Sequence, residues 1–237
     1  MKKLTLTTFL SILALLAVAI VPASADPITF TYSGDNSVIG GWYLTDGGSP
    51  TPIPSLPAAT SWQTASTFTL NLTPDPLHSY QIIWQVVNDD PSLNRNPSEF
   101  NPGGFLAQIA TPSPLFKGDW LSSSAWEVAF VPNLNQPGDL SSLSLSWVTA
   151  TQYGANDNSG TIWNQVNGGP IAGISGSAQW IWTAANFANE GAPGFMDSVF
   201  IKTTMTDPPS SVPEPSTLLL ISSGLISLVG LKKKFRK

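Results

Sequence analysis

The sequence predicts an all-β protein: a single β-sandwich between an N-terminal signal peptide and one C-terminal transmembrane helix. Two observations predict the sandwich. Apolar and polar residues alternate in short runs, which is the pattern of strands with one buried face. The 237 residues also include 21 prolines and 19 glycines, and both residue types disfavour helix interiors. The length permits one or two domains, and neither an internal repeat nor a second domain is evident.

The first 25 residues have the order of a secretory signal peptide. Two lysines near the start precede an apolar stretch that is strongest over 12–21. The small residues Ala23 and Ala25 then occupy positions −3 and −1 before Asp26, which is the pattern of signal cleavage. A permanent anchor is the alternative, but the strongly apolar part is too short to span a bilayer. We therefore expect residues 1–25 to be removed and the mature chain to begin at Asp26.

The body, residues 26–206, is expected to be built from strands joined by loops rich in Pro, Gly and Asn. Alternation predicts strands over 28–33, 67–73, 143–147 and 199–203, with further strands near 39–44, 105–110, 126–131, 161–166 and 179–183. Segment 80–87 is apolar on both faces, so we expect it in the centre of a sheet. No helix is expected in the body. Periodicity leaves both a jelly-roll and an immunoglobulin-like strand order open.

The C-terminal end combines three features in a fixed order. A polar linker, 207–211, leads to the segment Val212, Pro213, Glu214, Pro215 and Ser216, then to an apolar stretch over 216–231, and then to five cations in the last six residues. The apolar stretch would form about 24 Å of helix, enough to span a thinned bilayer with snorkelling lysines. The cations would hold the extreme C-terminus in the cytoplasm and leave the body outside.

This order resembles the PEP-CTERM sorting signal of Gram-negative bacteria. The resemblance implies that Pro213, Glu214 and Pro215 are recognised by an exosortase, an integral-membrane enzyme similar to cysteine proteases. It also implies an inner-membrane-anchored precursor, cleavage near the motif, and delivery of the body to the outer surface or to an exopolysaccharide matrix. An ordinary single-span tail anchor preceded by prolines is the alternative reading.

Two parts of the body resemble galactose-binding-like jelly-roll domains. These parts are 34–38 with Tyr43 and 46–47, and 177–182 followed by 199–204. In the second part, Lys202 stands where the family has a basic residue in its closing strand. The resemblance implies a jelly-roll sandwich and carbohydrate binding, which many but not all such domains perform.

Charge and composition exclude several functions. Residues 26–211 carry a net charge of −11, which would repel phosphate backbones, so nucleic-acid binding is not expected. There is no cysteine and a single histidine, His78, which excludes disulfides, Cys nucleophiles and zinc sites with two imidazoles. The segment 173–177 breaks the nucleophile-elbow pattern at its last position. We therefore expect no enzymatic activity.

One polar loop is the candidate ligand site. Its residues are Tyr153, Asn156, Asp157, Asn158 and Trp163. Aromatic faces stack on sugar rings, and amides and carboxylates bond their hydroxyls. An Asx-rich turn without a ligand is the alternative. Among the other tryptophans, the core is expected to hold Trp84, Trp126, Trp147, Trp180 and Trp182, and also Trp42.

Calcium is the metal to expect, as a structural ion, because the loops offer oxygen ligands. Segments 156–158 and 89–90 are two sources of such ligands, and neither completes an EF-hand pattern. The expected function is therefore that of an exported surface protein whose lectin-like body contacts extracellular polysaccharide. A structural matrix protein without a defined pocket is one alternative. A glycoside hydrolase or lyase with two facing carboxylates is another.

Overall fold

The computed structural model describes a large part of the body of the chain. The described residues are 25–54, 56–57, 61–73, 78–88, 103–111, 120–134, 136–158, 160–184 and 197–206. The expected signal peptide before Ala25, the linker 207–211 and the sorting signal 212–237 lie outside these residues. Within the described ranges, no helix has the length and apolar character needed to cross a membrane.

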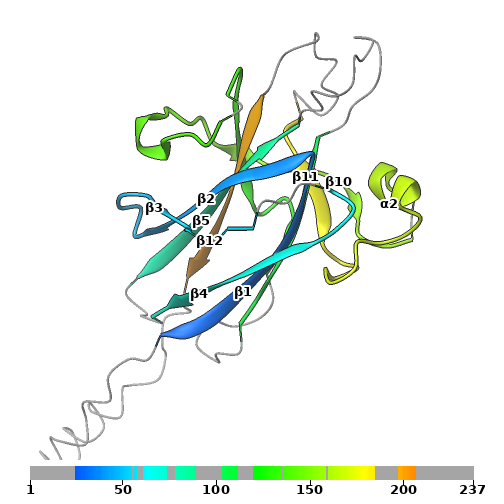
Figure 1. Ribbon diagram of the computed structural model, residues 1–237, viewed down its shortest axis with the longest axis horizontal. Coiled ribbons are helices and arrows are strands. Elements are labelled where there is room, and N and C mark those ends of the chain that lie inside the picture. The colour runs from blue at the N-terminus through cyan, green and yellow to red at the C-terminus, as the bar shows by residue number, and fades with distance from the viewer. Residues whose placement is uncertain are drawn as a thin grey trace, which may run out of the picture. The chain divides into compact units, whose positions relative to one another are not determined.

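Two antiparallel sheets form the body (Figure 1). The first has the order β10-β11-β6-β1-β4, with β7 paired to β6, and consists of Thr151–Ala155, Gln179–Trp182, Gly104–Ala110, Asp26–Asp35, Ser66–Leu72 and Trp120–Leu121. The second has the order β3-β2-β5-β12-β8-β9 and consists of Thr51–Pro52, Ser37–Thr45, Ser79–Val87, Ser198–Thr206, Glu127–Val131 and Val148–Thr149. The predicted β-sandwich is confirmed. From β1 to β8, the long strands alternate between the two sheets.

The core lies between the sheets and is rich in aromatic rings. Phe30 of β1 stacks on Phe68 of β4 with ring centroids 4.7 Å apart. Trp84 of β5 is fully buried and stacks on Trp126 at 5.6 Å. Strand β5 pairs with β2 on one side and β12 on the other, so the prediction of a central strand over 80–87 is confirmed. The buried hydrophobic residues run from Ile28 to Met205, so the core includes side chains from the first and the last strand of the described body.

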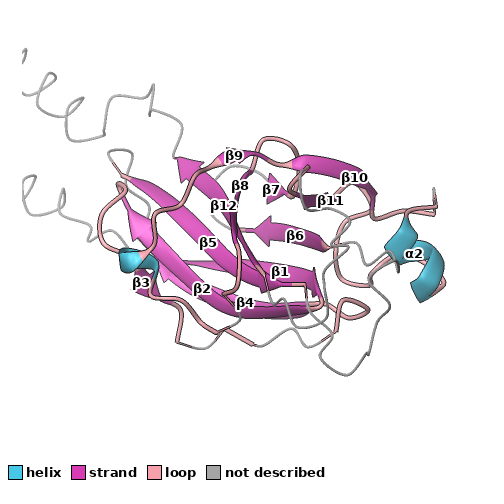
Figure 2. Ribbon diagram, turned by 90° about the horizontal axis from the view of Figure 1, so that it is seen from above, coloured by secondary structure: helices cyan, strands magenta, loops and turns pink. Residues whose placement is uncertain are grey.

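Two strand predictions are wrong. Segment 161–166 is the helix α2, Ile162–Asn167, seen beside β10 and β11 in Figure 2. Segment 143–147 forms no strand; it follows the short 3-10 turn η1, Leu140–Ser142, and precedes β9. Its alternating apolar residues do have a buried side, because they pack on the cluster around Phe200 on the outer face of the second sheet. The alternation in 143–147 therefore predicted correctly which side chains are partly buried. It did not predict the backbone, because this segment does not pair with a neighbouring strand.

Trp147 at the end of this segment is not a core residue, contrary to expectation. It is half-buried, and the Nζ atom of Lys202 lies 4.4 Å from the centre of its ring. Lys202 also forms an ion pair of 2.8 Å with Glu127. The other tryptophans expected in the core, Trp84, Trp126, Trp180, Trp182 and Trp42, are all buried.

Both ends of the described body lie at the same end of the sandwich. Strand β1 begins at Asp26, the residue predicted to start the mature chain, and Asp26 pairs with Leu72 at the end of β4. Strand β12 ends at Thr206, which pairs with Ser79 at the start of β5. Because the short connection between β4 and β5 joins these two points, the chain enters and leaves the sandwich close together. The last residue of β1, Asp35, therefore marks the opposite end of the body (Figure 1).

Candidate functional site

Helix α2 is defined by its two caps. Thr161 precedes it in an extended conformation, and its Oγ1 accepts a hydrogen bond of 3.2 Å from the backbone N–H of Asn164. Gly168 ends the helix with a φ of 77°, a left-handed conformation that glycine adopts without steric cost. The N–H of Gly169 then donates to the carbonyl of Asn164 at 2.8 Å. These caps define a helix of six residues. The sequence had instead predicted a strand over 161–166.

A buried pair of tryptophans holds α2 against the first sheet. Trp163 and Trp180 stack with ring centroids 4.6 Å apart and an angle of 14° between the planes. The Nε1 of Trp163 donates to Oδ2 of Asp35 at 2.9 Å, and the Nε1 of Trp180 donates to Oδ1 of Asn164 at 3.3 Å. Gly104 of β6 lies directly beneath Trp163, with room for no side chain. The helix is thus attached to the sheet by both packing and hydrogen bonds.

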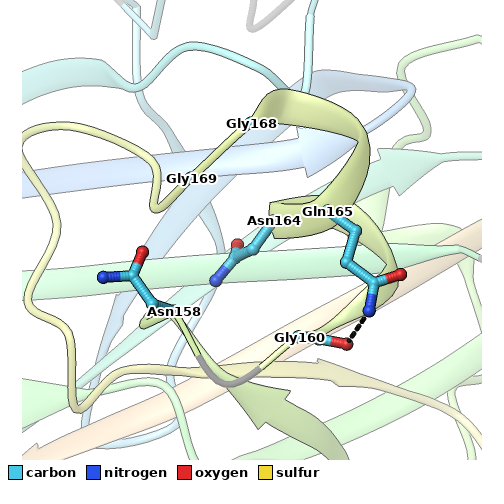
Figure 3. A pocket seen from close by; sticks show the side chains of 6 residues that line it. All are labelled: Asn158, Gly160, Asn164, Gln165, Gly168 and Gly169. Atoms are coloured by element: carbon cyan, nitrogen blue, oxygen red, sulfur yellow. Dashed lines mark hydrogen bonds between the residues drawn. The ribbon is translucent and has the colours of Figure 1, made fainter.

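A pocket of about 200 Å³ opens between α2 and the loop that precedes it (Figure 3). It is lined by Asn158, Gly160, Asn164, Gln165, Gly168 and Gly169. The side chain of Gln165 donates from Nε2 to the carbonyl of Gly160 at 2.9 Å, which closes one side of the loop. All the lining residues are uncharged. The pocket therefore presents amide groups and glycine backbone to a ligand, without a formal charge.

Only one of the five predicted ligand residues lines this pocket. Asn158 is exposed and does so, whereas Tyr153 lies on β10 and donates from its hydroxyl to the carbonyl of Thr183 at 3.1 Å. Partial burial raises the pKa of Tyr153 above its ordinary value of 10.0. Asp157 is half-buried, and its backbone carbonyl accepts a hydrogen bond of 2.5 Å from the side chain of Asn164. Ligand contact by Tyr153, Asp157 and Asn158 remains a prediction.

Trp163 has no exposed face for a sugar ring. Trp163 is 2% exposed, and Trp180 covers one face of its ring. Its indole N–H already donates a hydrogen bond to Asp35. The expected stacking role is therefore incorrect for Trp163, which instead anchors helix α2 to the first sheet. The polar loop before Trp163 correctly indicated the part of the chain that lines the pocket, but it did not indicate that the Trp163 ring is buried.

Asn156 is also a structural residue and not a surface ligand. It is fully buried, and its Nδ2 donates to the carbonyls of Ile171 and Ile174, both at 3.0 Å. Its Oδ1 accepts from the N–H of Ile171 at 2.7 Å. Both N–H donors of this amide and one lone pair of its oxygen are therefore engaged inside the body, and calcium binding by segment 156–158 remains a prediction. The other expected source of calcium ligands, segment 89–90, lies outside the described residues.

Sequence reasoning missed most of the pocket. The missed lining residues are Gly160, Asn164, Gln165, Gly168 and Gly169. A usable signal was present, because a threonine followed by a short segment ending in Asn-Gly-Gly fits an N-cap and a C-terminal glycine stop.

A second hollow lies on the outer face of the second sheet. It measures about 320 Å³ and is lined by Leu44, Gly48, Pro50, Gln81, Ile83, Leu140, Ser141, Leu143, Leu145, Trp147 and Lys202. Most of these residues are apolar, and the Lys202 side chain covers part of the Trp147 ring while it is paired with Glu127. The pocket beside α2 is therefore the better candidate for a polar ligand.

The fold defines the body as an antiparallel β-sandwich domain. Residues 211–234 match the family model of the PEP-CTERM protein-sorting motif. The chain therefore carries this sorting signal, as its sequence predicted, and it is an exported protein that an exosortase processes at the membrane. No curated protein and no solved structure matches the chain, so the expected likeness to galactose-binding-like domains finds no support among the comparisons.

Proposed function

We propose that the β-sandwich is a non-enzymatic, lectin-like module that binds neutral carbohydrate in the pocket beside α2. The observation that carries this proposal is the lining of the pocket, which combines amide side chains with glycine backbone and holds no charged group. Amides offer both donors and acceptors, which suits hydroxyl groups. A volume of about 200 Å³ lies below the range of about 300–1,000 Å³ typical of drug-sized ligands, so the pocket suits one sugar unit of a chain.

The charge of the body supports a neutral ligand. Residues 26–211 carry a net charge of −11, which disfavours the approach of polysaccharides that bear carboxylates or sulfates. The position of the pocket supports binding at a surface. Trp163 of α2, the helix that lines the pocket, bonds to Asp35, at the end of the sandwich opposite to Asp26 and Thr206. The pocket is thus held away from the point where the chain continues into its sorting signal.

We also infer the route by which the body reaches its place of action. The stretch 216–231 holds the precursor in the inner membrane, with the body outside and the basic tail in the cytoplasm. Exosortase acts near Pro213, Glu214 and Pro215, and the body passes to the outer surface or to an exopolysaccharide matrix. A pocket that binds the matrix polymer would retain the processed body there.

Binding of residues 26–206 to neutral and uronate-containing polysaccharides, measured on a glycan array and by calorimetry, tests the ligand proposal. Asn158→Ala and Gln165→Ala are each expected to weaken binding about three- to tenfold, the loss of one or two hydrogen bonds. Asn71→Ala is the matched control, because Asn71 is an exposed amide on β4 away from the pocket.

Equal affinity of both variants and the control would reject the pocket as the binding site. Equal, weak binding to every polymer would instead favour a structural matrix protein without a defined ligand. A trypsin-resistant fold in each variant, checked in parallel, separates loss of binding from loss of structure.

A further inference from the structure

Strand β4 lies at one edge of the first sheet, beside β1 (Figure 1). All seven of its residues pair with β1, from Ser66 opposite Tyr32 to Leu72 opposite Asp26. Among the described residues, no strand pairs with the other side of β4. Backbone N–H and C=O groups on the open side of an edge strand can pair with a strand from another molecule.

The other edges of the two sheets carry features that oppose such pairing. Strand β10, at the far edge of the first sheet, has a register shift between Gln152 and Ala155, and α2 lies beside it (Figure 2). In the second sheet, the edge strands β3 and β9 have two residues each, and β3 contains Pro52. Bulges, prolines and short strands protect sheet edges from association. Strand β4 has an unbroken register, no proline and no charged residue.

The side chains of β4 suit a second strand beside it. Thr67, Thr69 and Asn71 are exposed, so the outer face at this edge is polar and uncharged. On the inner face, Phe68 is buried in the core, whereas Leu70 is only half-buried. A strand added beside β4 would cover part of the apolar surface that Leu70 still exposes to water.

We propose that β4 pairs with β4 of a second copy of this chain, antiparallel and centred on Thr69, so that the two first sheets form one continuous sheet. This register places Thr69 opposite the partner's Thr69 and Thr67 opposite the partner's Asn71. It also places Phe68 opposite the partner's Leu70. The register uses the whole strand and keeps outward side chains opposite outward side chains, which a shift of one residue would not do.

The charge of the body favours this edge for a contact between two copies. Residues 26–211 carry a net charge of −11, so two copies repel each other overall. A strand without charged side chains adds nothing to that repulsion. The hydroxyl of Thr67 and the amide of the partner's Asn71 also offer each other donors and acceptors, as cross-strand polar pairs do.

Such a dimer leaves both candidate pockets open. Helix α2 lies beside β10 and β11, and β10 is at the edge of the first sheet opposite to β4. Two pockets on one particle would hold a polysaccharide chain at two points, which raises the apparent affinity. This consequence rests on the proposed function, whereas the pairing of β4 does not, so dimer formation and carbohydrate binding are tested separately.

Sedimentation equilibrium of the exported, processed protein tests the association. The mass is expected to double reversibly as the protein concentration rises. Added salt should shift this transition to lower protein concentrations, because it screens the repulsion between two acidic bodies. Slower amide hydrogen exchange over 66–72 at high protein concentration should locate the contact. A protein that stays monomeric up to about 1 mM would overturn the proposal.

Thr69→Cys tests the pairing in the full chain. The natural chain has no cysteine, so a disulfide between two copies must join the two introduced thiols. Directly opposite residues of antiparallel strands have Cα atoms about 4.5–5.5 Å apart, which a disulfide can bridge. Oxidation with copper phenanthroline should give a dimer on a non-reducing gel. Thr204→Cys, at an exposed position of β12 with strands on both sides, is the matched control and should stay monomeric; equal cross-linking of both variants would overturn the proposal.

Two double variants test the register. Thr67→Lys with Asn71→Lys places like charges opposite each other and should abolish the dimer, whereas Thr67→Lys with Asn71→Glu places opposite charges there and should retain it. Thr45→Lys with Thr204→Lys adds the same charge at exposed threonines of the second sheet and should associate as the unaltered protein does. Circular dichroism checks that each variant is folded. A dimer that persists in the first variant, or is lost in both of the first two, would overturn the pairing centred on Thr69.

Discussion

Gly104 should be the most sensitive glycine of the site. A Cβ atom added to Gly104 would lie 2.5 Å from Cζ2 of Trp163, 2.7 Å from its Cε2, and 3.0 Å from Cε3 of Trp180. Both rings are buried and stacked on each other, so neither can turn away as a flexible side chain would. Gly104→Ala must therefore push the pair of rings away from β6 or displace the strand.

The expected cost follows from two contributions. Overpacking of a buried site by a methyl group costs about 1–3 kcal/mol. Displacement of Trp163 would also weaken its bond to the buried Asp35 carboxylate, and hydrogen bonds to charged groups contribute about 1.5–3 kcal/mol. Partial loss of that bond brings the total to about 2–4 kcal/mol. For a body of this size, the melting temperature should fall by about 4–16 °C.

Thermal and urea unfolding of residues 26–206 measure this cost, and near-ultraviolet circular dichroism reports the stacked indoles. Gly176→Ala is the matched control, because the nearest atom to its added Cβ is the carbonyl oxygen of Asn156 at 3.5 Å, an ordinary contact. The control should change stability little, or raise it slightly by restricting the unfolded chain. Equal stability of the two variants, with an unchanged dichroism band for the indoles, would refute the reasoning.

Two further predictions concern pH and sorting. The backbone N–H of Ser79, 2.7 Å from Oδ1 of Asp46, and the adjacent His78 hold the pKa of Asp46 below its ordinary value of 3.8. A carboxyl group whose pKa is lower in the folded protein than in the unfolded chain stabilises the fold at pH values above its unfolded pKa. This stabilisation is lost as the pH falls through the folded pKa. Asp46→Asn should therefore destabilise the body more at about pH 5 than at about pH 2.5, as melting temperatures would show, and an equal deficit at both would contradict the prediction. Glu214→Ala should leave full-length precursor in the inner-membrane fraction on immunoblots, whereas Ser210→Ala, outside the motif, should be processed normally; normal processing of both would exclude recognition through Glu214.

The strands that sequence reasoning located correctly are those in which the apolar pattern and the burial agree. Segment 28–33 of β1 alternates and buries its apolar residues in the core, whereas segment 80–87 of β5 is apolar on both faces and is largely buried between its neighbours β2 and β12. The segment 143–147 shows why alternation alone is insufficient. Its apolar residues pack on one side, but β8 pairs instead with Val148–Thr149.

The pocket was only partly predictable for a different reason. The loop before Trp163 is polar and lies at the right place in the chain, which identified Asn158. Whether Trp163 faced a ligand or the interior depended on Asp35, which is 128 residues away in sequence, and on the absence of a side chain at Gly104. No local pattern reports such contacts, because they exist only after distant strands have come together.

The sequence by itself determined the sorting signal and the β-sandwich, because each depends on residues that are neighbours in the chain or alternate along one strand. Tertiary structure alone decided the strand order, the helical state of α2 and the burial of Trp163. It also left β4 at the edge of the first sheet. These features depend on pairing between segments far apart in the chain, and that pairing is set by the packing of the whole core.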